Sequence, residues 1–293
     1  MAIMFAEKNQ CPACKTRRMG KPLIKLERFS VYVCDCGVKY LDPSLDEKSQ
    51  IEIYQNSDSI SEINKALEQY YEYEPLRSTS QTARDYDRAL TEAGKSVAGR
   101  DLCEIGCGTG DFLFFAKSRG WNVFGIDSST ENIEKTRSRG IEGIAENVFR
   151  YSSQRRFDVV VLWDVIEHPQ DPGKLLAKCH ELLKPGGCLL VAIPYDPNLI
   201  SILATLFYKL SFGKVRGPAA QWYVLEHTSY FSGRGLKGLL ERNSFAAVKY
   251  WKTETDLARY KFAFLTRLAL RVLFGIARIL GLQNRSIMVA KKV

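Results

Sequence analysis

The sequence has no internal repeat and no low-complexity tract, and 45% of its residues are apolar against 26% charged. This composition excludes a fibrous or intrinsically disordered chain. The sequence also lacks, at its start, a basic segment followed by an apolar run and a small-residue cleavage site. We therefore expect no signal peptide and a cytoplasmic location. A chain of 293 residues buries roughly three quarters of its unfolded surface, so it needs no disulfide scaffold.

Acidic residues are fewer than basic ones. The chain has 33 Asp and Glu against 42 Lys and Arg, which gives a formal net charge of +9. This balance permits an anionic partner, such as nucleic acid, a phosphorylated substrate or an acidic membrane surface, without requiring one. Composition alone therefore leaves the partner open.

The character of the chain changes along its length, and we expect three parts. Residues 1–44 hold half of the eight cysteines. The first forty residues contain eight Lys and Arg but three acidic residues. Residues 45–98 are rich in Glu, Gln and Tyr, which indicates a helical N-terminal cap. Residues 99–293 follow a repeated order of strand, turn and helix.

Short apolar or β-branched runs recur in this third part and alternate with amphipathic stretches. Such alternation is typical of a parallel sheet that helices cover on both faces. The sequence therefore predicts a doubly wound α/β domain. The predicted strands are DLCEI (101–105), WNVFGI (121–126), FDVVVLW (157–163) and GCLLVAIP (187–194).

A glycine-rich segment, DLCEIGCGTGD (101–111), follows the first predicted strand, at the end where open α/β sheets bind ligands. A dinucleotide site of the GxGxxG type requires a third small residue at position 111. This chain has Asp111 there, whose carboxylate would repel the pyrophosphate, so a dinucleotide site is disfavoured. The second predicted strand ends in Asp127. A carboxylate at that place can accept hydrogen bonds from both hydroxyls of a ribose.

These motifs resemble those of class I S-adenosylmethionine-dependent methyltransferases. The resemblance covers about residues 80–252 and is closest to the branch that acts on small molecules such as quinone precursors, sugars and polyketides. It implies a Rossmann-like sheet of seven strands whose last strand, residues 284–293, is antiparallel. The motifs that carry it are the glycine loop, FGIDSS, FDVVVLWDVIEHPQDP, LLKPGG, VAIP and EHTSYFSGRGLKGLLE.

The resemblance also implies which residues bind the cofactor, S-adenosyl-L-methionine. Glu104 would lie near its amino group, Asp127 would hold the ribose hydroxyls and Ser128 would lie beside the adenine. Ala145 and Glu146 stand where many members have an adenine-contacting Asp-Ala pair, so Glu146 departs from the pattern. The predicted set is Glu104, Gly106, Cys107, Gly108, Gly110, Asp127, Ser128, Ala145, Glu146, Trp163 and Asp164.

The end of the predicted strand at 157–163 is expected to meet the substrate. Trp163 and Asp164 would line the methionine end of the cofactor site; the alternative is a core tryptophan and a helix cap. His168 follows one turn later and is the candidate catalytic base for a hydroxyl acceptor, since methyl transfer needs a base only when the nucleophile loses a proton. A structural histidine is the alternative. His227 is the second candidate, and His180 is expected at the surface or at the edge of the core.

Two close cysteine pairs lie near the start of the chain, CPAC and CDCG, separated by 19 residues. Thiolates on two such turns can converge on one tetrahedral zinc ion. The predicted ligands of a structural Zn²⁺ are Cys11, Cys14, Cys34 and Cys36, and the alternative is four reduced thiols in a small β-rich extension. The layout of residues 1–44 resembles the zinc ribbon at the front of some sugar and secondary-metabolite methyltransferases.

Two apolar insertions interrupt the third part, at about residues 197–217 and 256–282. Residues 262–282 contain fifteen apolar residues and three arginines on one helical face, Arg267, Arg271 and Arg278. Arginines near the middle make a membrane span costly. The helix at 257–282 is therefore predicted either to make peripheral contact with the inner face of the membrane or to form a lid over the sheet.

The leading hypothesis is methyl transfer from S-adenosylmethionine to a small-molecule acceptor that is quinone-like, a sugar or lipid-linked. An RNA methyltransferase is the second, since a basic zinc ribbon could hold RNA phosphates. Against it, Trp163 and Asp164 stand where adenine-amino methylation would use an NPPY-like motif. A non-enzymatic membrane-associated scaffold is the third, and the intact Glu104, glycines and Asp127 argue against it.

Overall fold

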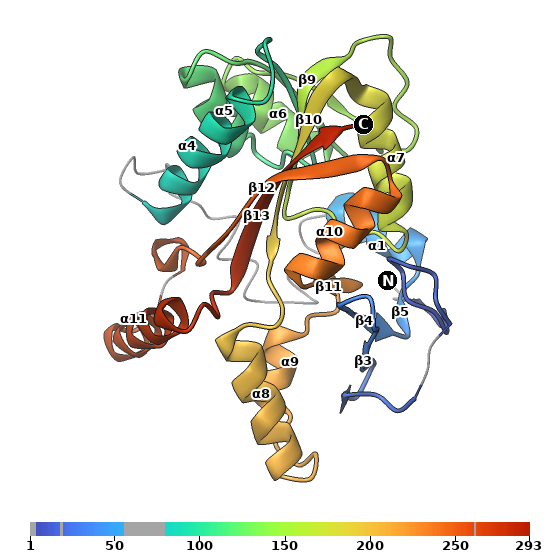
Figure 1. Cartoon of the computed structure of the whole chain (residues 1–293), viewed down its shortest axis with the longest axis vertical. Coiled ribbons are helices and arrows are strands. Elements are labelled where there is room, and N and C mark those ends of the chain that lie inside the picture. Colours follow the sequence, from blue (N-terminus) through green and yellow to red (C-terminus); the bar gives the residue numbers. More distant parts are fainter. Residues whose placement is uncertain (1–3, 18–19, 56–79, 261) are drawn as a thin grey trace.

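The computed structural model describes residues 4–17, 20–55, 80–260 and 262–293. The predicted helical cap lies partly outside these residues; within them, α1 spans Glu47–Gln55 and α4 spans Gln81–Gly94. The centre of the molecule is a seven-stranded sheet with helices on both sides (Figure 1). The predicted doubly wound α/β fold is confirmed.

The seven strands follow the sequence pattern closely. They are β6 (Asp101–Ile105), β7 (Asn122–Asp127), β8 (Glu142–Ala145), β9 (Phe157–Trp163), β10 (Leu183–Pro194), β12 (Phe245–Thr253) and β13 (Arg285–Lys292). Their order in the sheet is β12-β13-β10-β9-β6-β7-β8. The last strand, β13, runs antiparallel to both of its neighbours, as the resemblance implied.

Side chains on the strands pack alternately on the two faces of the sheet. Val159 and Val161 of β9 join a core cluster with residues of α4, whereas Val160 and Leu162 join a cluster on the other face. Because successive side chains of a strand point to opposite faces, each run of apolar residues is buried on both sides. The remaining helices of these layers are α5 (Asp111–Ser118), α6 (Thr130–Ser138), α7 (Pro172–Leu182) and α10 (Gly233–Arg242).

A second sheet joins the N-terminal segment to the rest of the chain. It contains β2 (Ile24–Lys25), β3 (Ser30–Val33), β4 (Val38–Asp42) and β11 (Ser229–Phe231), in the order β11-β4-β3-β2. Nearly two hundred residues separate β4 from β11, yet Tyr40 pairs with Ser229 and Val38 with Phe231. A further pair of short strands, β1 (Phe5–Ala6) and β5 (Ser44–Leu45), closes the segment on itself. The division at residue 44 stays a prediction, but the parts on either side of it share one sheet.

The two apolar insertions form helices that project from the body (Figure 1). The first contains α8 (Leu199–Leu210), followed by α9 (Gly217–Trp222). A capping box in which Asn198 and Ser201 bond to each other's backbone begins α8. The second contains a short 3₁₀ turn, η1 (Leu257–Arg259), and α11 (Phe264–Ile279).

A buried ion pair ties the N-terminal segment to the end of β10. The fully buried Asp196 carboxylate pairs with the Lys39 ammonium of β4. It also accepts hydrogen bonds from Trp222 Nε1 at 2.9 Å and from the Tyr223 hydroxyl at 3.2 Å. A carboxylate removed from water in this way needs its cation, since a lone buried charge is strongly destabilising.

We expect the Lys39→Met variant to lower the free energy of unfolding by about 3–5 kcal/mol, because Asp196 would stay buried without its cation. Urea denaturation of the full chain measures this loss. The matched control, Lys15→Met, breaks a 2.9 Å ion pair with Asp171 whose side chains are 47% and 31% exposed, and it should cost no more than about 1 kcal/mol. Equal losses in the two variants would contradict the assignment.

Candidate active site

The loop after β6 has three glycines in the left-handed region, with φ of 69° at Gly106, 52° at Gly108 and 79° at Gly110. A Cβ at Gly106 would lie 2.7 Å from Val165, and one at Gly110 would lie 2.9 Å from Thr136. At Gly108 nothing lies within 4 Å of a Cβ. Packing therefore requires two of the glycines, whereas at the third the backbone faces open space that a ligand can enter.

Asp127 is held at the end of β7 by three donors. Its Oδ2 accepts the Gly108 N–H at 2.8 Å, and its Oδ1 accepts the Ser129 N–H at 2.9 Å and the Asn132 side-chain amide at 3.3 Å. Burial raises the pKa of Asp127 despite these bonds. The carboxylate thus fixes the glycine loop and keeps further lone pairs for a ligand.

A cavity of about 610 Å³ opens at the carboxyl ends of β6, β7 and β9, within the range of small-molecule sites. Gly110 and Ala145 do not line it: Gly110 is the N-cap of α5, and Ala145 packs against the core. Eleven predicted residues do line it: Glu104, Gly106, Cys107, Gly108, Asp127, Ser128, Glu146, Trp163, Asp164, His168 and His227.

Glu104 gives the cavity its electrostatic character. The residue is 3% exposed, and its Oε2 has no hydrogen-bond partner among the described residues. Burial first, and then the nearby carboxylates of Asp111, Asp127 and Asp164, raise the pKa of Glu104 well above its usual range. A desolvated carboxyl group beside other acids is stabilised in its charged form by a cation. The site therefore favours a ligand with a positive charge at this point.

Aromatic side chains form one wall of the cavity. Trp163 makes an edge contact with Tyr86, with ring centroids 4.6 Å apart, and stacks on Phe112 at 5.4 Å. The next residue, Asp164, has a φ of 56° and accepts a hydrogen bond from Arg285 at 2.7 Å. A non-glycine residue in this strained region at the end of a strand is typical of functional sites.

A cluster of buried polar groups lies where the turn after β9 meets the segment before β11. The Thr228 N–H donates to the Glu167 carbonyl at 2.9 Å. The rings of His168 and His227 are 4.7 Å apart. His168 Nδ1 lies 3.0 Å from the Glu226 carbonyl, and Nε2 lies 3.1 Å from the Asp164 carbonyl. His168 therefore connects the two segments through Nδ1, whereas Nε2 contacts the turn that carries His168 itself.

Two other groups of this cluster, Glu167 and His227, have polar atoms without a hydrogen-bond partner among the described residues. Glu167 is 1% exposed, and neither of its carboxylate oxygens has a hydrogen-bond partner in the part of the chain that the structure describes. Burial raises its pKa well above the usual range. The Nδ1 atom of His227 has no such partner either, and burial lowers its pKa. The role of His168 as a base remains a prediction, whereas its observed contacts are structural.

Several lining residues were not found from the sequence. Tyr86 comes from α4, Asn132 from α6 and Arg285 from the start of β13, and only the tertiary fold brings them together. Glu226 precedes His227 in the EHTSYF motif, so attention to the whole motif would have found it. His180, by contrast, lies in α7 against Phe245, where it was expected.

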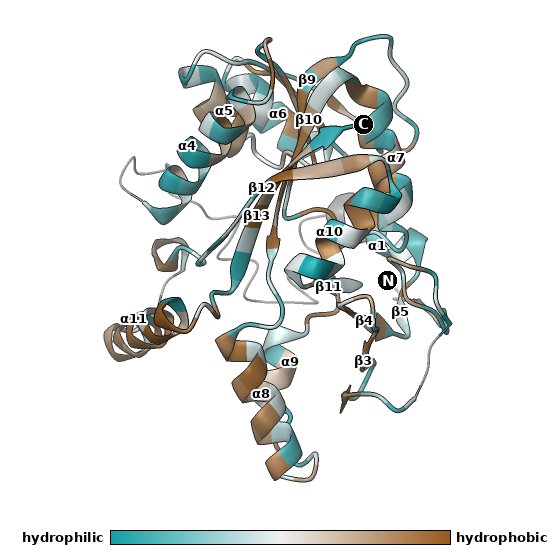
Figure 2. Cartoon of the chain, viewed as in Figure 1, coloured by the Kyte–Doolittle hydropathy of each residue, from teal (hydrophilic) through white to brown (hydrophobic). Residues whose placement is uncertain are grey.

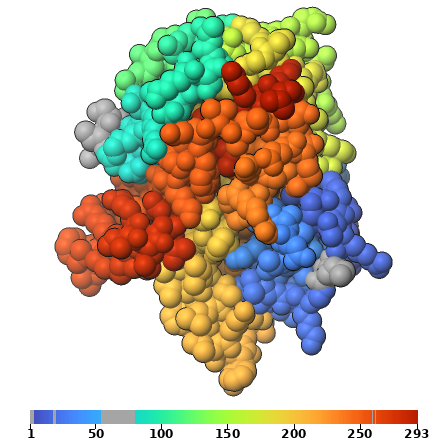
Figure 3. Space-filling model, in the orientation of Figure 1, coloured from blue at the N-terminus to red at the C-terminus, as the bar shows by residue number. Residues whose placement is uncertain are grey.

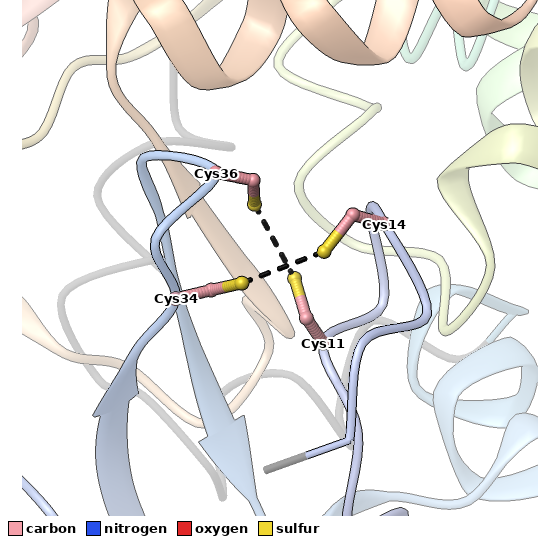
Figure 4. Close-up of side chains that lie close together, drawn as sticks. All are labelled: Cys11, Cys14, Cys34 and Cys36. Carbon is pink, nitrogen blue, oxygen red and sulfur yellow. Dashed lines mark hydrogen bonds between the residues drawn. The ribbon is translucent and has the colours of Figure 1, made fainter. Parts of the chain in front are cut away.

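The four cysteines of the N-terminal segment converge (Figure 4). The Cys11 and Cys36 sulfurs are 3.7 Å apart and those of Cys14 and Cys34 are 3.4 Å apart, too far for disulfides. Tetrahedral zinc at 2.3 Å from each sulfur would place the sulfurs about 3.8 Å apart. Hydrogen bonding from Cys11 lowers the pKa of Cys36 to about 5 against the opposing effect of burial. The cluster thus has the size of a four-thiolate metal site.

Comparison of the sequence with protein families gives one match. The model of a family described as "Methyltransferase domain" matches residues 78–250, more than half of the chain. Among curated proteins, a ubiquinone biosynthesis O-methyltransferase from Psychrobacter cryohalolentis is 30% identical over 144 residues, which cover 44% of this chain and 56% of the relative. The chain spans about half the length of the curated relatives it matches.

Solved structures share the fold. The 1,6-didemethyltoxoflavin-N1-methyltransferase of Burkholderia thailandensis, with its substrate and S-adenosylhomocysteine bound, has a TM-score of 0.56 at 14% identity and covers 94% of this chain and 100% of its own. The magnesium protoporphyrin IX methyltransferase of Synechocystis PCC 6803, with S-adenosylhomocysteine, has a TM-score of 0.55 at 13% identity and covers 85% and 100%. At these identities the likeness concerns the fold alone.

Proposed function

Because the chain belongs to the family of methyltransferase domains, we propose that it transfers a methyl group from S-adenosylmethionine to a small-molecule acceptor. The observation that carries the proposal is the buried Glu104, which lines an acidic cavity beside the glycine loop and whose Oε2 has no hydrogen-bond partner within the described residues. S-adenosylmethionine carries an ammonium and a sulfonium, so it supplies the positive charge that this cavity favours.

The residues at the carboxyl edge of the sheet fit the parts of this cofactor. Glu104 would face the ammonium, the open backbone at Gly108 would lie against the methionine part, and Asp127 would accept the ribose hydroxyls. When bound, the cofactor supplies a methyl group on a positively charged sulfur. Transfer is an in-line displacement, so the main task of the protein is alignment, for which Trp163 and Asp164 form a rigid wall.

We propose that the acceptor is quinone-like, a sugar or a lipid-linked molecule, and that it meets the polar cluster around His168. If the reacting group is a hydroxyl, its proton needs an acceptor within hydrogen-bond reach. Glu167 and His227 have atoms available for it. The similarity to ubiquinone biosynthesis O-methyltransferases supports a hydroxyl on a quinone precursor as the first acceptor to test.

We further propose that Cys11, Cys14, Cys34 and Cys36 bind one structural zinc ion. Four thiolates close the tetrahedron and leave no position open for a substrate. The ion would fix the turns beside β4. Its position outside the cavity gives it a role in stability, because none of the four cysteines lines the cavity.

The affinity for S-adenosylmethionine should increase as the pH rises through the raised pKa of Glu104, because the bound ammonium pairs with the carboxylate and not with the neutral acid. Binding should release a proton in that range. Titration calorimetry at several pH values and in buffers of different ionisation enthalpy measures both effects.

The Glu104→Gln variant should bind S-adenosylmethionine about tenfold or more weakly than the wild type, because it loses the 1.5–3 kcal/mol of a charged hydrogen bond. Its affinity should also lose the pH dependence. A wild type whose proton release matches that of Glu104→Gln would contradict this assignment.

Asp127→Asn should weaken binding of S-adenosylhomocysteine by about 1.5–3 kcal/mol, because hydrogen bonds to a charged acceptor become bonds to a neutral one. Calorimetry again measures the affinity. Asp101→Asn is the matched control, since Asp101 lies at the opposite end of β6 and outside the cavity. If both variants bind as the wild type does while remaining folded, Asp127 does not hold the ribose.

Metal analysis of protein purified under reducing conditions without chelator should find one zinc per chain. The Cys36→Ser variant should lose it, because a hydroxyl is a much poorer zinc ligand than a thiolate. Cys179→Ala, which changes a buried cysteine of α7, should keep it. Wild-type protein that is folded and free of metal would leave the four reduced thiols as the correct interpretation.

A further inference from the structure

Most of the exposed large apolar side chains in the described residues lie on the two insertions. Of 21 such side chains, seven belong to α11 and the residue after it, and six belong to α8 and the loop that follows. Figure 2 shows both helices as predominantly apolar, and Figure 3 shows both projecting from the body. Isolated exposed apolar residues are ordinary, but contiguous ones mark an interaction surface.

The helix α11 presents its apolar face away from the protein. Phe274 and Ala277 are its buried residues. The predicted arginine stripe lies on the same side as these residues: Arg267 donates to the Tyr260 carbonyl at 3.0 Å, and Arg278 pairs with Glu254. On the opposite face of α11, apolar residues recur at helical spacing, and no other described part of the chain packs against them. Its exposed residues are Leu265, Leu268, Val272, Ile276 and Ile279.

The loop after α8 forms a second apolar projection with positive charge around it. Phe212 is 94% exposed at its tip. Lys209, Lys214 and Arg216 are exposed beside it. An apolar tip with a basic surround is the pattern of a surface that enters the boundary between headgroups and acyl chains.

Both insertions are poor in acidic residues. Residues 197–217 contain three basic residues and no Asp or Glu, and residues 256–282 contain five basic residues and one acid, Asp256. The rest of the chain mixes the two signs. The excess of positive charge on the two insertions is complementary to an anionic surface.

The two insertions leave the body at neighbouring points. The Leu199 N–H, at the start of α8, donates to the Leu282 carbonyl, just after α11, at 3.0 Å. The cavity wall includes Trp222 of α9 and Tyr260, which precedes α11. A surface that binds both projections would therefore lie near residues of the cavity wall.

We propose that α8 with its following loop and α11 together form a docking surface for an anionic phospholipid bilayer. Among the described residues, no helix is long and apolar enough to cross a bilayer, so the contact is peripheral. The apolar faces enter the interface, and Lys209, Lys214 and Arg216 contact the lipid phosphates. The surface extends the proposed function, because it places an acceptor that resides in the membrane close to the cavity.

Sedimentation with vesicles of phosphatidylglycerol and phosphatidylcholine in equal parts tests the proposal on the full chain. The wild type should bind, and added salt should release it. The double variant Leu268→Asp, Val272→Asp should reduce the partition coefficient at least tenfold. The control variant is Phe114→Asp, Val248→Asp. Its two side chains are 53% and 54% exposed, similar to those of the test variant, and it adds the same two negative charges on another surface. It should therefore bind as the wild type does.

A second pair of variants tests the charge. Replacing Lys209, Lys214 and Arg216 by Gln should remove most of the salt dependence and the preference over pure phosphatidylcholine vesicles. The control variant changes three exposed lysines of other surfaces, Lys48→Gln, Lys174→Gln and Lys237→Gln. If the two triple variants lose binding equally, the net charge and not this surface attracts the lipid.

Two results would overturn the proposal. One is wild-type protein that stays in the supernatant at low salt. The other is a wild type that light scattering shows to be a dimer and that Leu268→Asp, Val272→Asp converts to a folded monomer, because a second copy then covers the apolar face. Calorimetry with S-adenosylhomocysteine on the same samples separates these outcomes from failure of the proposed function, since lipid binding needs no methyl transfer.

Discussion

The cavity depends on carboxylates that are buried or paired at the carboxyl edge of the sheet. Glu104 is buried with one oxygen unbonded among the described residues, Asp127 is fixed by backbone N–H groups, and Asp164 is paired with Arg285. Burial raises the cost of charging Glu104, and the negative charges of Asp127 and Asp164 raise it further. A protein retains such an arrangement when a ligand offsets the cost, and a cationic nucleoside is the ligand whose parts match these groups.

The N-terminal segment contributes to the same architecture. Strand β4 pairs with β11, and β11 directly follows the segment that carries Glu226 and His227 into the cavity wall. Lys39 neutralises the buried Asp196 just after β10. A metal ion bound by the four cysteines would therefore stabilise a sheet that adjoins this part of the cavity wall. Two lysines of this segment, Lys8 and Lys15, also contact Gln170 and Asp171, which leaves less basic surface for RNA phosphates.

The sequence was sufficient for the fold and for most of the residues that line the cavity beside the glycine loop, because both follow local patterns. The strands β6 and β9 have the predicted limits, and Asp127 ends β7 as expected. The opposite wall of the cavity was harder to predict from the sequence. Tyr86, Arg285 and the pairing of β4 with β11 depend on contacts between distant segments, which no local pattern encodes. The stripe of arginines on α11 was predicted. That this stripe faces the protein was not, because it depends on contacts of the arginines with Tyr260 and Glu254.

The most direct test of the account is native mass spectrometry of the full chain with S-adenosylhomocysteine, with NAD⁺ as the comparison ligand. The account predicts one bound S-adenosylhomocysteine per chain and no NAD⁺, because Asp111 opposes a pyrophosphate while the acidic cavity favours an ammonium. A chain that keeps its folded charge-state distribution but binds no S-adenosylhomocysteine at any concentration, or that binds NAD⁺ as well, would contradict it.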